Sequence, residues 1–132
     1  MPADPTIPIP DGPAGLLLSR DLIFTSKITG TAQALGHRVV VVGGVALARG
    51  ILERWAPVVV FVDLAAGDLV ASPALLQYRE AAPPGTPFVA FGSHVDLESL
   101  ADAKAAGCDP VLPRSRFTTE LPDLIRRHFA AG

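Results

Sequence analysis

The stretch Val58-Val59-Val60-Phe61-Val62-Asp63 decides the fold of this chain. Five consecutive β-favouring apolar residues predict a strand that is covered on both faces, as the strands of parallel sheets are. In an open parallel α/β sheet, ligands bind just beyond the carboxyl ends of the strands. Asp63 lies at that end and is therefore a candidate functional group, with the alternative that it caps a helix or bonds to a loop.

Apolar runs and helical stripes alternate along the rest of the chain. Besides residues 58–62, strands are predicted at 15–18, 38–42, 88–91 and 109–112. Helices are predicted between and after them, over about 24–35, 45–55, 72–80, 97–107 and 117–129. We place Pro122 in the first turn of the last helix, where a missing N–H breaks no helical hydrogen bond. The predicted fold class is α/β and flavodoxin-like (βα)5, with a parallel sheet in the order 2-1-3-4-5 and helices on both faces.

Composition limits the classes of protein that this chain can belong to. Its 132 residues, 49% hydrophobic and 18% charged, predict one packed globular domain. A net charge of −2, with no basic run longer than Arg126-Arg127, argues against a nucleic-acid partner. No apolar run approaches the roughly 20 residues of a membrane-spanning helix, and no basic residue precedes Arg20 to suggest a signal peptide. We therefore expect a cytoplasmic protein without a membrane partner.

The first 13 residues differ in composition from the remainder. They hold five of the 13 prolines, which cannot donate a regular ladder of amide hydrogen bonds. We predict an extended or disordered tail over residues 1–13 and a single domain over residues 14–132. The alternative for the tail is a polyproline-type ligand for a partner domain.

Three segments resemble the receiver domains of bacterial response regulators. They are Val60-Phe61-Val62-Asp63-Leu64, Phe91-Gly92-Ser93-His94-Val95-Asp96-Leu97-Glu98 and Gly107-Cys108-Asp109-Pro110-Val111-Leu112-Pro113-Arg114. The order and spacing of the segments carry the resemblance, which extends over about residues 14–130. It implies a domain of two-component signal transduction.

The resemblance implies a chemical role for several positions. Asp63 aligns with the aspartate nucleophile that forms an acyl phosphate, and Arg114 with the lysine that neutralises the phosphoryl oxygens. The two acidic residues that help to bind Mg²⁺ align with Ser19 and Arg20, and Asp21 follows one place later. Ser19 or Asp21 could instead simply cap the first helix, without a role in the site.

Other positions depart from the receiver pattern as well. The hydroxyl residue that ends the fourth strand aligns with Gly92, with Ser93 one residue further on. The aromatic switch residue of the fifth strand aligns with Val111. The proline and phenylalanine that follow the lysine align with Ser115 and Arg116.

These departures predict an altered site. Only Asp21 and Asp63 remain to neutralise a divalent ion, so that the affinity for Mg²⁺ should be poor. Either Arg20 or Arg114 could pair with Asp63 in place of the metal. We expect Asp63, Asp21 and at least one of the two arginines to converge at the carboxyl edge of the sheet.

The resulting functional hypothesis is a stand-alone, receiver-like signalling module that binds a partner protein or a histidine kinase. It is a degenerate pseudo-receiver, is not an enzyme and needs no cofactor. One alternative is a working phosphoacceptor that uses Asp63 and an unusual Mg²⁺ site. Another is a flavodoxin-like domain that binds or converts a small ligand through Asp21, Asp63, Ser93 and Arg114.

Charged residues on the last two helices suggest a homodimer through the fourth helix, the fifth strand and the fifth helix. The fourth helix carries Asp96, Glu98 and Asp102, and the fifth carries Arg126 and Arg127. A two-fold axis would let each acidic helix meet the basic helix of the other copy. The alternative is that these charges only form a solvated face.

Overall fold

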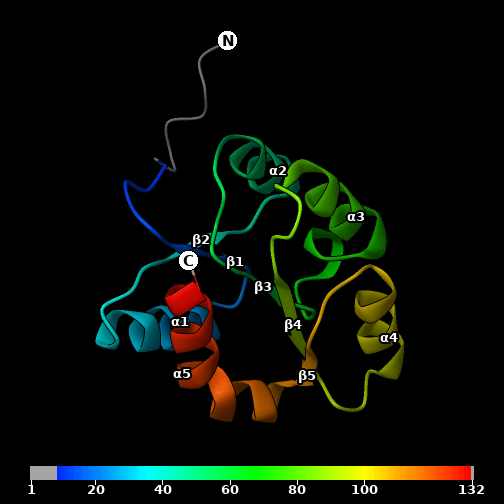
Figure 1. The fold of residues 1–132 in the computed structure, drawn as a ribbon. Coiled ribbons are helices and arrows are strands. Elements are labelled where there is room, and N and C mark those ends of the chain that lie inside the picture. The colour runs from blue at the N-terminus through cyan, green and yellow to red at the C-terminus, as the bar shows by residue number, and fades with distance from the viewer. Residues whose placement is uncertain (1–8, 132) are drawn as a thin grey trace.

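The computed structural model of the chain describes residues 9–131 (Figure 1). Residues 9–13, the described part of the predicted tail, form no helix or strand. Residues 1–8, the remainder of that prediction, lie outside the described residues. No helix of the described part is long and apolar enough to cross a membrane.

Five parallel strands form one sheet in the order β2-β1-β3-β4-β5, which confirms the predicted fold class. Their bounds are Gly15–Leu18 (β1), Val39–Val42 (β2), Val60–Asp63 (β3), Phe88–Gly92 (β4) and Val111–Pro113 (β5). In this register Leu18 lies beside Val62, and Asp63 lies beside Phe91. The central strand β3 therefore ends with its aspartate between the ends of β1 and β4.

Helices connect the strands and cover both faces of the sheet. They are α1 (Leu22–Ala34), α2 (Val45–Arg54), α3 (Ser72–Ala81), α4 (Leu97–Ala105) and α5 (Arg114–Ala131), with a 3-10 turn, η1 (Gly67–Leu69), before α3. Figure 1 shows α1 and α5 on one face and α2, α3 and α4 on the other. All elements lie within two residues of their predicted bounds except α5, which begins three residues earlier.

The alternation of side chains along the strands divides the core into two layers. Leu16, Leu18, Val60 and Val62 point into the layer beneath α2, α3 and α4. Leu17 and Phe61, which alternate with them, point into the layer beneath α1 and α5. Because both layers are apolar, the strands are continuous apolar runs, which is why their sequence indicates a parallel sheet.

The placement of Pro122 in a first helical turn is wrong. Because β5 ends at Pro113, α5 begins at once with Arg114, and Pro122 falls inside the helix. A proline there cannot donate to the carbonyl oxygen of residue 118, and its ring disfavours a straight helix. In Figure 1 the first, orange part of α5 and its last, red part run in different directions. The predicted apolar stripe of the helix is nevertheless buried, from Phe117 to Ile125.

Candidate functional site

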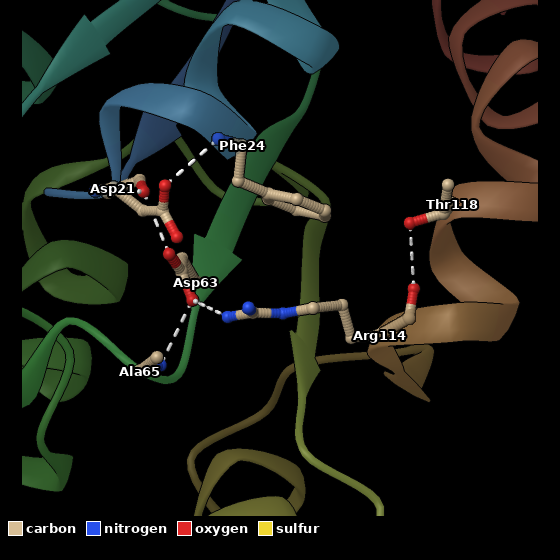
Figure 2. A network of polar contacts seen from close by, with 7 residues as sticks. Asp21, Phe24, Asp63, Ala65, Arg114 and Thr118 are labelled. Carbon is tan, nitrogen blue, oxygen red and sulfur yellow. Dashed lines mark hydrogen bonds and ion pairs between the residues drawn. The ribbon is translucent and has the colours of Figure 1, made fainter.

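Asp63 is a buried carboxylate at the carboxyl end of β3, with 1% of its surface exposed. Its Oδ2 accepts a hydrogen bond from Ser19 Oγ at 2.8 Å. Its Oδ1 accepts one from the backbone N–H of Ala65 at 3.0 Å and another from Arg114 Nη2 at 3.2 Å (Figure 2). Both oxygens of the carboxylate are therefore engaged, and one partner carries a full positive charge.

Arg114, the first residue of α5, reaches across the end of the sheet to Asp63 (Figure 2). The Cζ of its guanidinium lies over the ring of Phe24, 4.9 Å from the ring centroid. Such a cation–π contact restricts the guanidinium in addition to the ion pair. Its Nε is buried without a hydrogen-bond partner among the described residues, although 38% of the side chain is exposed. The ion pair thus joins a buried carboxylate to a guanidinium group on a partly exposed side chain.

Arg20, the other arginine considered from the sequence, points to a different carboxylate. Its Nη1 pairs with Asp68 Oδ1 at 2.6 Å and also donates to the carbonyl oxygen of Ala66. Its Nε donates to the carbonyl oxygen of Gly43 at 3.0 Å. The hydrogen bond from Arg20 and its charge lower the pKa of Asp68, and the same bond raises the pKa of Arg20. Arg20 therefore connects the loops that follow β1, β2 and β3.

Ser19 and Asp21 lie on either side of Arg20 in the segment that follows β1. Ser19 is buried and donates a hydrogen bond to Asp63. Its Oγ also accepts a hydrogen bond from the backbone N–H of Asp21, at 3.2 Å. The Oδ1 of Asp21 accepts the backbone N–H of Phe24 at 2.9 Å and so caps the first turn of α1. The structure therefore places Asp21 at the predicted crevice as a helix cap, and its link to Asp63 passes through Ser19.

Gly92 ends β4 at a point where a side chain has little room. A Cβ built on this residue would lie 3.1 Å from the Cβ of Leu64 and 3.2 Å from its Cδ1. The neighbouring Ser93 is exposed, and its Oγ accepts the backbone N–H of Val95 at 3.3 Å. The leucine beside Asp63 thus fills the space that a hydroxyl side chain at position 92 would need.

Replacing Gly92 by serine is expected to lower the free energy of unfolding by about 1–2 kcal/mol, because the new side chain overpacks against Leu64. Urea denaturation followed by circular dichroism measures this difference. The matched control is Gly30→Ser in α1, where a Cβ has no neighbour within 4 Å and little change is expected. Equal stabilities of Gly92→Ser and Gly30→Ser would contradict the crowding at Gly92.

Magnesium is the ion that the receiver resemblance implies, and the residues of this crevice do not fit it. Mg²⁺ requires oxygen ligands in near-octahedral geometry. The oxygens of Asp63 already bond to Ser19, Ala65 and Arg114, and Asp21 accepts a helix N–H. Among residues 9–131, no three His, Cys, Asp or Glu side chains are grouped so as to hold a metal ion. No chemical step is therefore assigned to a metal at this site.

A groove of about 560 Å³ opens beside this network at the carboxyl edge of the sheet. It is lined by Leu64, Ala65, Ser93, His94, Asp96, Arg114 and Ser115. Arg114 contributes to the wall of the groove, whereas Asp63 is not part of the lining. The residue that the groove presents to solvent is thus the cation and not the candidate nucleophile.

Two charged residues of the suggested dimer face already bond to residues of α4 and α5. Asp96 caps α4 by accepting the N–H and the hydroxyl of Ser99, and these bonds lower the pKa of Asp96. Arg126 pairs with Asp123 one turn earlier, at 3.1 Å. Glu98, Asp102 and Arg127 are exposed.

Four phenylalanines form a cluster beneath the site that the sequence did not indicate as a unit. Phe117 stacks on Phe91 with 4.1 Å between ring centroids, and it meets Phe61 edge-on at 5.5 Å. Phe24 lies 5.1 Å from Phe91 and carries the guanidinium of Arg114 on its ring. Phe24 and Phe117 are the first residues of two predicted helical ranges, but only contacts in the structure link them to Arg114. The sequence also did not indicate that Asp68 pairs with Arg20, or that the N–H of Ala65 bonds to Asp63.

Solved structures of receiver domains share this fold. A response regulator from Thermotoga maritima is 18% identical, with a TM-score of 0.72 over 89% of this chain and 98% of that one. The receiver domain of the sensor histidine kinase PA1611 from Pseudomonas aeruginosa, solved with a magnesium ion in its active site cleft, is 21% identical, with a TM-score of 0.75 over 90% and 98%. The receiver domain of NtrX from Brucella abortus is 17% identical, with a TM-score of 0.74 over 89% and 99%.

The comparisons with sequences give no further relative. No model of a protein family matches the chain, and no curated protein sequence matches it. The structural comparisons therefore define the class of the fold: this chain has the fold of response-regulator receiver domains. The resemblance seen in the three sequence segments is confirmed at this level.

Proposed function

We propose that this chain is a receiver-like protein-interaction module in which the phosphorylation chemistry is degenerate. The observation that supports the proposal most directly is the state of Asp63, a carboxylate that is 1% exposed, accepts hydrogen bonds on both oxygens and pairs with Arg114. The module acts by binding other proteins and is not an enzyme.

Phosphorylation of Asp63 would need a free carboxylate oxygen in line with a phosphoryl donor. It would also need a divalent cation to neutralise the charge that develops on the transferring group. Here Arg114, whose side chain stays protonated in proteins, already places a positive charge beside Asp63. The counter-charge of Asp63 is therefore supplied by the chain itself, which favours a constitutive binding module over a switch.

The surface formed by α4, β5 and α5 is the proposed docking face for a partner protein or a histidine kinase. Val95, two residues before α4, and Leu97, its first residue, are exposed by 73% and 72%. The exposed charges of Glu98, Asp102 and Arg127 lie on the two helices. Apolar side chains surrounded by charges are typical of protein interfaces. Among the structural neighbours, the activated NtrC4 receiver domain is a dimer.

The melting temperature is expected to stay unchanged when Mg²⁺ is added at millimolar concentrations. A ligand that binds only the folded state raises the melting temperature by mass action, and this crevice offers no suitable set of oxygens. The control is the double variant Ser19→Asp with Arg20→Asp, which supplies the acidic pair and should respond to Mg²⁺. A clear rise for the unaltered chain that is lost in Asp63→Asn would instead support the phosphoacceptor alternative.

A further inference from the structure

The groove beside the Asp63 network has the position and the size of a site for a small molecule. It opens at the carboxyl edge of the sheet, where open α/β sheets bind their ligands. Its volume of about 560 Å³ lies within the range of roughly 300–1,000 Å³ that is usual for ligand pockets. The loops after β3 and β4 and the first two residues of α5 form its walls. Binding residues are most often found on loops that a rigid scaffold positions, which is the arrangement here.

Arg114 is the charged group with which this groove can hold a ligand. It is the only lysine or arginine among the described residues of the lining. Asp63 and the ring of Phe24 hold its guanidinium in position (Figure 2). Among residues 9–131 the guanidinium makes a single hydrogen bond, to Asp63, although it carries several N–H groups. A guanidinium that is already oriented binds a carboxylate with little further loss of conformational freedom.

The charges around the groove favour a ligand with a single negative charge. Asp96 is the carboxylate of the lining, and Asp63 pairs with the guanidinium that the ligand would contact. Asp96 caps α4 and accepts two hydrogen bonds from Ser99, so that these donors and the helix N-terminus partly offset its charge. Each further negative charge on a ligand would still be repelled by both carboxylates. A carboxylate therefore fits the groove better than a dianion such as phosphate.

The apolar part of the wall indicates what the rest of the ligand is. Leu64 is half-buried, and Ala65 is exposed in the groove. Val95, which lies between two residues of the lining, has 73% of its surface exposed. Covering such surface stabilises a complex in proportion to the apolar area that is removed from water. A carboxylate that carries an apolar chain would use both features of the groove.

We propose that this groove binds a small organic monocarboxylate. Its carboxylate pairs with Arg114, and its apolar part lies along Leu64 and Ala65. Asp63 holds the guanidinium in position and does not itself contact the ligand. Binding is reversible and involves no phosphoryl transfer, so that its test does not depend on the degenerate chemistry proposed above. The interaction module thus gains a small-molecule ligand.

Titration of the isotope-labelled full chain with sodium hexanoate, followed by nuclear magnetic resonance, tests the proposal. We expect the amide resonances of Ala65, Ser93 and Ser115 to shift and to define one dissociation constant. Hexanol has the same chain length without the charge, and it should bind at least about tenfold more weakly, because the charge-assisted hydrogen bond is lost. Sodium phosphate at the same ionic strength should also bind at least about tenfold more weakly, because it lacks an apolar part and carries more charge.

Two variants locate the ligand in the groove. Arg114→Gln should weaken the binding of hexanoate by about tenfold or more and should leave that of hexanol unchanged, which loss of structure alone would not do. Ala65→Phe fills the groove and keeps the backbone N–H that bonds to Asp63, so that hexanoate should no longer bind. The control Ala46→Phe, at an exposed alanine of α2 outside this groove, should bind hexanoate as the unaltered chain does.

Several results would overturn the proposal. One is the absence of shifts at these amides with hexanoate at tens of millimolar. Others are equal binding of hexanoate and hexanol, binding of phosphate as tight as that of hexanoate, and binding of hexanoate that survives Ala65→Phe. None of these results decides whether Asp63 is phosphorylated, which a measurement of intact mass decides separately.

Discussion

Replacing Phe117 by alanine is expected to lower the free energy of unfolding by about 3–5 kcal/mol, the largest effect of any change near the site. Its side chain is fully buried. It stacks on Phe91 of β4 at an interplanar angle of 18° and meets Phe61 of β3 edge-on at 76°. Removing the ring would leave a cavity beneath Asp63 and would separate α5 from the two central strands.

Urea denaturation at constant pH measures the effect of Phe117→Ala. The control is Phe129→Ala on the same helix, because this ring is only partly buried and stacks on His37 near the end of the chain. Its cost should be smaller by at least about 1 kcal/mol. A loss at Phe117 no greater than that at Phe129 would show that the aromatic cluster is not the anchor of α5.

Replacing Arg114 by alanine is expected to lower the free energy of unfolding by about 2–3 kcal/mol. Removing one partner of a fully buried ion pair costs roughly 3–5 kcal/mol, because the remaining charge has no counterion. The value expected here is lower because 38% of the Arg114 side chain is exposed and solvent can partly replace it, whereas Asp63 is 1% exposed. The loss of the contact with Phe24 adds to the effect.

A double-mutant cycle separates the ion pair from the other contacts of Arg114. In the background of Asp63→Asn, which keeps the shape of the side chain but removes its charge, Arg114→Ala should cost about 1–2 kcal/mol less than in the unaltered chain. Equal costs in the two backgrounds would mean that Arg114 and Asp63 are not coupled. The pairing of Arg114 with Asp63 would then carry no weight in the proposed function.

The fold could be predicted from the sequence because its strands are buried on both faces. A run such as residues 58–62 leaves few alternatives to a strand in a parallel sheet, and right-handed connections restrict the order of the strands. The order β2-β1-β3-β4-β5 then brings the ends of β1, β3 and β5 to one edge. For this reason Ser19, Asp63 and Arg114 could be assigned to one crevice.

The roles of individual side chains at this crevice could not be predicted. Arg20 and Arg114 were equivalent candidates for Asp63, and the choice depends on Asp68, which lies 48 residues after Arg20. Which carboxylate an arginine pairs with depends here on the paths of two loops, and the conformational propensities of neighbouring residues do not reveal it. Gly92 is crowded by Leu64, the residue that follows β3, and a contact between residues so far apart in the sequence cannot be predicted from the local sequence.

The start of α5 was misplaced for a different reason. The prediction gave Pro122 the position that proline prefers, in a first helical turn. The structure instead starts the helix at Arg114, where the side chain bonds to Asp63 and the hydroxyl of Thr118 donates to the carbonyl oxygen of Arg114. The helix is therefore longer than the position of Pro122 suggests, and its first residue makes contacts at the site.

Intact-mass measurement after incubation with a small phosphodonor and Mg²⁺ tests the central claim most directly. Phosphorylation of a receiver aspartate adds one phosphoryl group per chain. Because Asp63 is buried, hydrogen-bonded on both oxygens and paired with Arg114, we expect no such gain. A stoichiometric gain of one phosphoryl group, absent in Asp63→Asn, would contradict the account and would identify the chain as a working phosphoacceptor.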